Sequence, residues 1–162
     1  LRDGGCKRVA VLDVDYHHGN GTQSLFYERD DVLVVSVHGD PRTEYPFYLG
    51  HADETGAGAG LGHNLNLPLA AGTSAAHWFE ALELACQRVQ QQRVDALVVS
   101  LGLDTFCGDP ISTFKLETDD FLRLGARLER LGCPTAFVLE GGYAAMELGK
   151  NAANVLDGFE GG

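Results

Sequence analysis

The chain has 162 residues, a length compatible with a single hydrophobic core. Its 23 acidic and 12 basic residues give a formal net charge of −11, which argues against binding to nucleic acid or to an anionic membrane and favours cationic partners. Cys6, Cys86, Cys107 and Cys133 form no Cys-x-x-Cys pair, and no signal peptide or membrane span is visible, so we expect a reducing, cytoplasmic setting. The sequence is compatible with a homo-oligomer.

The first predicted element is a strand over residues 9–12. Its short β-branched run, Val9-Ala-Val-Leu12, is typical of a strand that is buried on both faces. A Gly-rich turn follows and leads into a helix predicted over residues 22–26. Ligands bind at the carboxyl ends of strands in open parallel α/β sheets, so the polar residues of this turn form a candidate catalytic metal site.

Asp15 and His17 are the strongest candidates for metal ligands in this turn. They are two residues apart, so on an extended segment both side chains point the same way and could share one ion. Asp13 has the same parity, but a third ligand from the same run would crowd the ion. We therefore expect Asp13 to orient an imidazole, and we place His18 with it among the residues that support the ligands.

The remaining predicted elements alternate between strands and helices. In chain order they are a strand over 32–37, a Gly-rich loop over 44–62, a short strand over 63–67, a helix over 74–93 and a strand over 95–103. A helix over 118–131, capped by Thr118-Asp-Asp-Phe121 and stopped by Gly132, precedes a strand over 135–139 and a final helix. This alternation predicts an α/β fold with a parallel sheet flanked by helices.

Polar residues follow two further strands of this predicted sheet. Asp104 comes directly after the strand over 95–103, and Glu140-Gly141-Gly142-Tyr143 follows the strand over 135–139. Each of these stretches alone is typical of a structural turn. Because all three polar strand ends would meet at one edge of one sheet, their recurrence favours a functional site.

These motifs resemble the zinc-dependent histone deacetylase and acetylpolyamine amidohydrolase superfamily, which has the arginase-deacetylase fold. Asp-x-Asp-x-His-His-Gly-x-Gly-Thr-Gln, Ser-Leu-Gly-x-Asp-x-x-x-Gly-Asp-Pro and Leu-Glu-Gly-Gly-Tyr occur in the order and spacing of the family, and the resemblance covers essentially the whole chain. The segments 36–41 and 50–56 are similar to the bacterial amidohydrolase branch.

The resemblance implies roles for individual residues. Asp15, His17 and Asp104 would be the ligands of a catalytic Zn²⁺, with Fe²⁺ as an alternative metal. Tyr143 would donate a hydrogen bond to the amide carbonyl of the substrate and stabilise the oxyanion, while Gly141 and Gly142 would let it swing inward.

The resemblance also implies a substrate tunnel and bound potassium. Tyr48, with Phe47 close behind, would line the tunnel, although a hydrophobic plug that ties the loop down is nearly as well supported. One structural K⁺ would be bound by main-chain oxygens of Asp13, Asp15, His17 and Val37 and the hydroxyl of Ser36, and a second by the carbonyls of Phe26, Arg29 and Val32.

The sequence departs from the family in one respect. The family uses a pair of adjacent histidines, the general base and acid, ahead of the Asp-x-His motif, whereas the twelve residues before Asp13 contain no histidine. The one His-His pair, His17-His18, belongs to the metal motif. We therefore expect residues 1–162 to be the C-terminal part of a single deacetylase-like catalytic domain whose N-terminal part is absent, corresponding to the C-terminal portion of the arginase-deacetylase fold.

The expected function is hydrolysis of an acetylated amine to acetate and the free amine. Acetylpolyamines are the leading substrates, and acetyl-lysine in proteins is the nearest rival. Manganese ureohydrolases of the arginase type are less favoured, because they need more carboxylates to bridge two ions. A catalytically inactive metal-binding module that lacks the general-base histidines is the non-enzymatic alternative.

Overall fold

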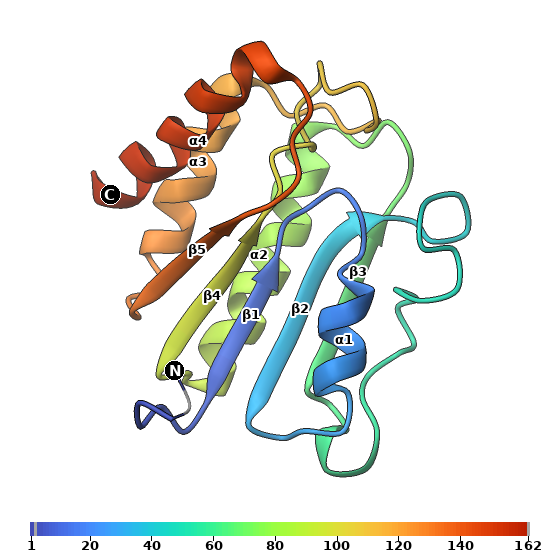
Figure 1. Cartoon of the computed structure of the whole chain (residues 1–162), viewed down its shortest axis with the longest axis vertical. Coiled ribbons are helices and arrows are strands. Elements are labelled where there is room, and N and C mark those ends of the chain that lie inside the picture. The colour runs from blue at the N-terminus through green and yellow to red at the C-terminus, as the bar shows by residue number, and fades with distance from the viewer. Residues whose placement is uncertain (2, 162) are drawn as a thin grey trace.

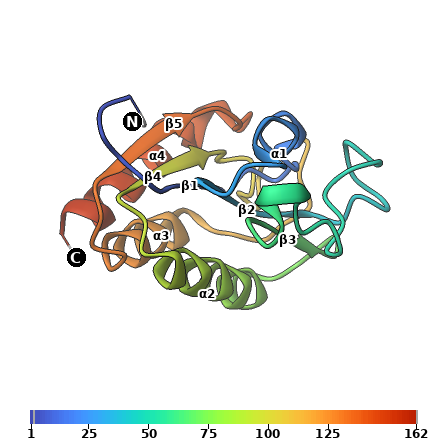
Figure 2. The same cartoon turned by 90° about the horizontal axis from the view of Figure 1, so that it is seen from below.

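The computed structural model describes residue 1 and residues 3–161 and consists of one parallel sheet with helices on both faces (Figures 1 and 2). The strand order is β3-β2-β1-β4-β5, and every neighbouring pair is parallel. The strands are β1 (Val9–Asp13), β2 (Val32–Gly39), β3 (Asn64–Leu69), β4 (Ala96–Leu101) and β5 (Thr135–Leu139). The prediction of an α/β fold with a parallel sheet is confirmed.

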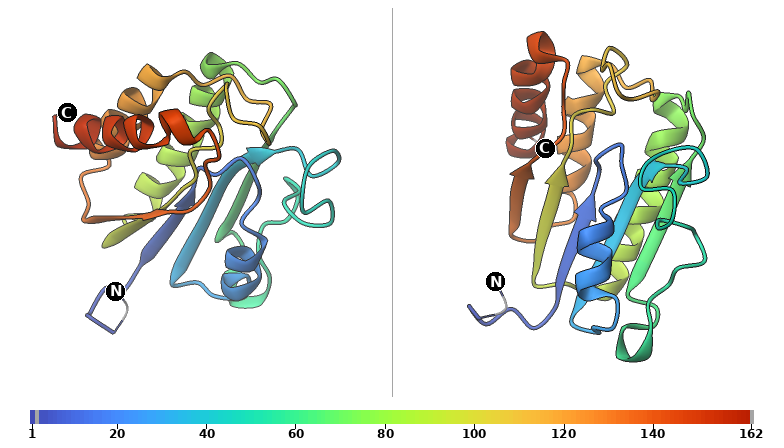
Figure 3. Two further views of the ribbon diagram at one scale, coloured as in Figure 1. Left: turned by 45° about the horizontal axis from the view of Figure 1, so that its top comes forward. Right: turned by 45° about the vertical axis from the view of Figure 1, so that its right-hand side comes forward.

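The helices cover the two faces of the sheet unequally. They are α1 (Asn20–Phe26), α2 (Ala75–Gln92), α3 (Thr118–Glu129) and α4 (Ala145–Glu160), and a short 3-10 turn, η1, covers Gly58–Gly60. Helix α1 lies on one face, whereas α2, α3 and α4 lie on the other (Figures 2 and 3). The main hydrophobic core lies between the sheet and α2, α3 and α4, with Trp78, Leu82 and Phe121 fully buried.

Burial falls from the centre of the sheet towards β5. Every residue of β1 and β2 is buried, as is usual for central strands of a parallel sheet. In the described part of the chain β5 pairs only with β4, and its Val138 and Leu139 are 52% and 55% exposed. The sheet edge at β5 is therefore open to solvent.

The start of helix α3 differs from the sequence prediction by one residue. Helix α3 is capped by Glu117 and not by Thr118, because the Glu117 side chain accepts the backbone N–H of Asp120 while the Asp120 carboxylate accepts the N–H of Glu117. Gly132 follows with φ +66°, as expected for the residue that stops a helix. No helix among the described residues is long and apolar enough to cross a membrane.

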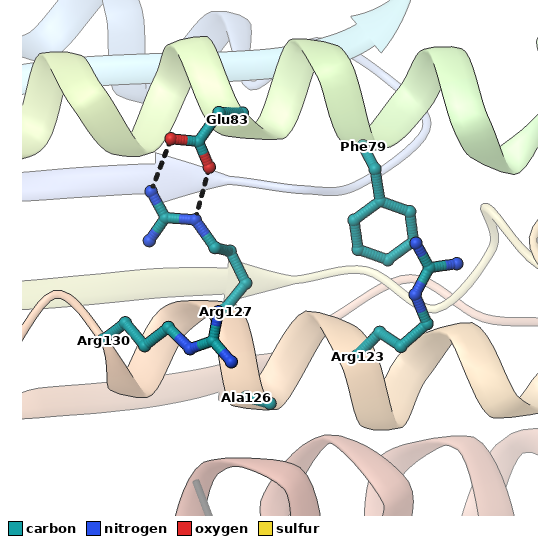
Figure 4. Close-up of a pocket in the computed structure, with 6 residues that line it drawn as sticks. All are labelled: Phe79, Glu83, Arg123, Ala126, Arg127 and Arg130. Atoms are coloured by element: carbon teal, nitrogen blue, oxygen red, sulfur yellow. Dashed lines mark hydrogen bonds and ion pairs between the residues drawn. The ribbon is translucent and has the colours of Figure 1, made fainter.

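Helices α2 and α3 are joined at the surface by arginine contacts (Figure 4). The Arg127 guanidinium donates two hydrogen bonds to the Glu83 carboxylate, at 2.6 and 3.1 Å. The Arg123 guanidinium lies 4.2 Å from the centre of the Phe79 ring. These contacts join the two helices side by side on the face of the sheet that carries α2, α3 and α4.

Candidate metal centre

The site begins where β1 ends, and hydrogen bonds from backbone to carboxylate shape the turn. The Asp13 carboxylate accepts the N–H of Asp15 at 3.0 Å, and Asp15 Oδ1 accepts the N–H of His17 at 2.7 Å. The backbone therefore bends over residues 15–17, directly after β1, and is not the extended segment that we expected. The Asp15 and His17 side chains nevertheless point to one place, as their spacing predicted.

Asp104 reaches the same place from the end of β4. Its Oδ1 accepts the N–H of Tyr16 at 2.9 Å, which ties the β4 loop to the β1 loop. One ligand atom from each of Asp15, His17 and Asp104 lies within 4.8 Å of the others. His17 Nδ1 is 3.3 Å from Asp15 Oδ1 and 3.2 Å from Asp104 Oδ2. The three strand-end residues thus converge into one cluster of metal-ligating atoms.

The chemistry of this cluster fits a divalent cation. Asp104 is fully buried, and within the described structure its Oδ2 makes no hydrogen bond of good geometry and has the His17 imidazole, 3.2 Å away, as its ion-pair partner, so this buried oxygen needs a cation beside it. Two carboxylates and one imidazole form a ligand set that Zn²⁺ accepts, and they leave a coordination position open. Asp15, His17 and Asp104 are therefore consistent with a metal site.

The electrostatics of the cluster lead to the same conclusion. The Asp104 and Asp15 carboxylates, within 3.3 Å of His17 Nδ1, raise the pKa of His17 to about 10, which favours the imidazolium in the absence of metal. Burial raises the pKa of Asp104, and it raises the pKa of Asp13 well above its ordinary value. Burial and the nearby Asp15 raise the pKa of Glu140. This concentration of carboxylates favours a bound cation.

Two glycines let the backbone pack directly against the ligands. A Cβ on Gly141 would lie 2.1 Å from Asp15 Oδ2 and 3.1 Å from Asp104 Oδ2. A Cβ on Gly102 would also lie 2.1 Å from Asp15 Oδ2 and would reach the Asp15 backbone at 2.5 Å. Glycine is thus required at both positions by the close approach of the ligands.

A pocket of about 470 Å³ opens over the metal-ligating atoms. Its lining residues are Asp15, His17, Tyr45, Glu140, Gly141 and Tyr143. The Tyr143 side chain is 56% exposed at the pocket. Two of the three candidate ligands, Asp15 and His17, therefore share a single opening with Tyr143 and Gly141, whereas Asp104 is buried below it.

The aromatic residue of the 44–62 loop that lines this pocket is Tyr45. Its ring centre lies 6.3 Å from that of His17, and sequence reasoning did not select it within the Tyr-Pro-Phe-Tyr cluster. Phe47 and Tyr48, which we expected at the tunnel, are 61% and 65% exposed and do not line the pocket. The Tyr48 hydroxyl instead accepts a hydrogen bond from the Asn20 side chain at 3.2 Å.

The two residues expected to support the ligands have different surroundings. Asp13 is hydrogen-bonded by the backbone N–H of Asp15, and no imidazole contacts its carboxylate in the described structure. The His18 ring is buried, hydrogen-bonded to Gln23 at 3.0 Å and stacked at a tilt on His38, with ring centres 4.6 Å apart. Burial lowers the pKa of His18. His18 therefore belongs to a buried polar cluster beside α1 and does not line the pocket.

The proposed potassium ligands lie close to these elements. The register of β1 and β2 places Ser36 opposite Asp13, and the Ser36 hydroxyl is hydrogen-bonded to His38 Nδ1 at 2.7 Å. The second set lies around the turn from α1 to β2, where the Phe26 carbonyl accepts the N–H of Arg29 at 3.0 Å. Both potassium assignments stay predictions.

The fold and the site together define an α/β protein with a cluster of metal-ligating side chains at the carboxyl edge of a parallel sheet. The family model described as the histone deacetylase domain matches residues 1–159, and the chain belongs to this family. The family identified from the sequence motifs is therefore confirmed.

Three relatives place the chain within the family. It is 60% identical over 159 residues to acetylpolyamine amidohydrolase 2 of Pseudomonas aeruginosa, covering 98% of this chain and 46% of the relative. It is 50% identical over 161 residues to the acetylpolyamine amidohydrolase of Mycoplana ramosa, covering 99% and 47%. A crystal structure of acetylpolyamine aminohydrolase from Burkholderia pseudomallei superposes with a TM-score of 0.95 at 48% identity, covering 97% of this chain and 46% of that one. The chain thus spans slightly less than half the length of these relatives.

Proposed function

We propose that this chain provides the metal ligands and the oxyanion-stabilising tyrosine of a zinc-dependent amidohydrolase that releases acetate from acetylated amines. The observation that carries the proposal is the convergence of Asp15, His17 and Asp104 at the strand ends. The 60% identity to proteins named acetylpolyamine amidohydrolases supports acetylpolyamines as the substrate class.

The residues of the candidate site would have the following roles. A bound Zn²⁺ would polarise the amide carbonyl and activate the attacking water. Asp15, His17 and Asp104 hold the ion, and the imidazole of His17 must lose its proton to do so. The phenol of Tyr143 donates a hydrogen bond to the carbonyl oxygen as negative charge develops on it.

Among the described residues that line the pocket, His17 is the one histidine, and no imidazole is left there to act as a general base. His17 is committed to the metal cluster, and His18 is buried with its Nε2 hydrogen-bonded to Gln23. Neither histidine is free to take a proton from water in the pocket. We propose that the histidine pair expected from the family lies on polypeptide outside these 162 residues, and that residues 1–162 form the C-terminal part of one catalytic domain.

The charge of the protein favours small cationic substrates over neutral ones. The net charge of −11 raises the local concentration of polyamines and of lysine-bearing peptides alike. Glu140 and Asp15 line the pocket and would attract an amine group near the acetyl arm. The proposal also includes the two potassium sites expected from the family resemblance, and it includes Fe²⁺ as an alternative to Zn²⁺.

Acetate release from acetylputrescine and from an acetyl-lysine peptide tests this function, with the chain loaded with one equivalent of zinc. Tyr143→Phe should abolish any activity, whereas Tyr27→Phe, which changes a tyrosine at the end of α1, should not. A faster reaction with acetylputrescine would establish the substrate class. Zinc binding without acetate release would support the need for histidines supplied from outside this chain and would favour the metal-binding module for the chain alone.

A further inference from the structure

Asp109 is a buried carboxylate beside the pocket that has no role in the chemistry described so far. It lies in the loop between β4 and α3, five residues after Asp104, and is 6% exposed. Its Oδ2 accepts the backbone N–H of Tyr143 at 2.7 Å and that of Ala144 at 3.1 Å. Its Oδ1 accepts the N–H of Ile111 at 3.1 Å. One carboxylate thus joins the loop that carries a metal ligand to the loop that carries Tyr143.

The tyrosine loop is also fixed on the other side of Gly142. The N–H of Leu103 donates to the carbonyl of Gly141 at 2.9 Å, and the N–H of Glu140 donates to the carbonyl of Leu101 at 3.2 Å. Gly142 itself has φ +133°, and a Cβ there would lie 2.6 Å from Leu148. The backbone is therefore held both before and after this glycine.

The Tyr143 side chain contrasts with its backbone. The ring is 56% exposed, and no hydrogen bond to its hydroxyl is present in the described structure, whereas its N–H makes a short bond to a buried charge. Hydrogen bonds to charged groups are stronger than neutral ones, so this one resists opening of the loop. The side chain is therefore free to rotate on a backbone that is fixed.

A simpler role for Asp109 is to cap α4. The N-cap residue Ala144 has no side chain that could accept a hydrogen bond, and a carboxylate is favourable near the start of a helix. The bond to the N–H of Tyr143 goes beyond that role, because Tyr143 precedes the N-cap. Capping and positioning can be separated by observing Tyr143 directly.

We propose that Asp109 is a positioning residue for Tyr143, which it holds at a fixed distance from the metal ligand Asp104. Tyr143 then reaches the substrate carbonyl by rotation of its side chain, and the loop backbone at Gly141 and Gly142 does not swing. This inference rests on the role of Tyr143 in the proposed function.

The test observes the tyrosine in the chain labelled with 3-fluorotyrosine. The chain has five tyrosines, and the Tyr143→Phe variant identifies the ¹⁹F resonance of Tyr143. Asp109→Ala should shift this resonance and leave that of Tyr27 unchanged. Asp109→Asn should give a smaller shift of the Tyr143 resonance, because asparagine retains one acceptor oxygen. Asp53→Ala, at an exposed acidic residue, is the matched control and should change neither resonance.

Amide hydrogen exchange in the unmodified chain gives a second measurement that does not depend on the variant folding. The N–H groups of Tyr143 and Ala144 should exchange about tenfold or more slowly than unprotected amides, because each is bonded to a carboxylate. Exchange of both at the unprotected rate would overturn the proposal. The proposal would also be overturned if the Asp109→Ala chain folds, loses stability in α4 and keeps the Tyr143 resonance unchanged. That combination is the result expected from capping alone.

Neither measurement requires turnover. Failure of the chain to bind zinc would count against the proposed function and would leave the result on Asp109 interpretable.

Discussion

Gly141→Ala should remove the metal site while leaving the fold in place. The new Cβ would lie 2.1 Å from Asp15 Oδ2, where ordinary van der Waals contact begins at 3.4 Å, so the carboxylate oxygen must move by about 1.3 Å. Bonds from carboxylate oxygen to zinc tolerate only about 0.2 Å. Gly141 is not among the glycines with positive φ, so alanine brings no backbone strain of its own. The substitution therefore displaces the Asp15 carboxylate and does not strain the backbone at Gly141.

We expect zinc affinity to fall by at least about 100-fold, because even outer hydrogen-bond partners of a metal ligand are worth 10- to 100-fold. Competition with a chromogenic zinc chelator measures the affinity, and thermal unfolding with and without zinc shows whether the metal still stabilises the fold. Gly149→Ala is the matched control, because a Cβ at this position in α4 meets nothing within 4 Å. If Gly141→Ala bound zinc within threefold of the parent chain, the cluster as described could not be the metal site.

Four further outcomes follow from the same structure. Zinc affinity should rise about tenfold per pH unit from pH 6 to 8, because the pKa of His17 is raised to about 10 and the ion must displace that proton. Calorimetry measures the affinity at each pH, and an affinity that does not change with pH would contradict this prediction. In the metal-free chain, the same raised pKa stabilises the fold below about pH 6.5, and this contribution is lost as the pH rises towards 10. Leu82→Ala, at a fully buried position, should cost about 2–5 kcal/mol in urea unfolding, whereas Leu84→Ala, at a side chain that is 55% exposed, should cost less than about 0.5 kcal/mol. Asp120→Ala removes half of the capping box of α3 and should cost about 1 kcal/mol, and an equal loss in Asp119→Ala would show that the cap does not matter.

The sequence predicted the sheet and the metal ligands because both depend on short-range patterns. Buried β-branched runs identified the strands, and helical spacing identified α2 and α3, in each case to within a few residues of the structure. Asp15 and His17 are close in sequence, so their spacing was sufficient to pair them. The rule that the carboxyl ends of parallel strands meet at one edge placed Asp104 near them, and the family resemblance implied its role as a ligand.

Local pattern could not choose between residues of equal chemical character. The residue pattern selected Thr118 as the cap of α3, whereas the hydrogen bonds of the structure select Glu117. Tyr45 and Tyr48 stand three residues apart in one aromatic cluster, and the path of the loop places Tyr45 at the pocket. These choices depend on backbone direction, which the sequence pattern does not carry.

The sequence by itself determined the fold class, the family and the three residues that form the candidate metal cluster, because strand pattern and motif spacing act over a few residues. Only the tertiary structure decided that His18 turns into a buried cluster with His38 and that Asp109 holds the backbone of Tyr143. Both contacts join residues that are far apart in the chain, and packing of the loops against the sheet brings them together.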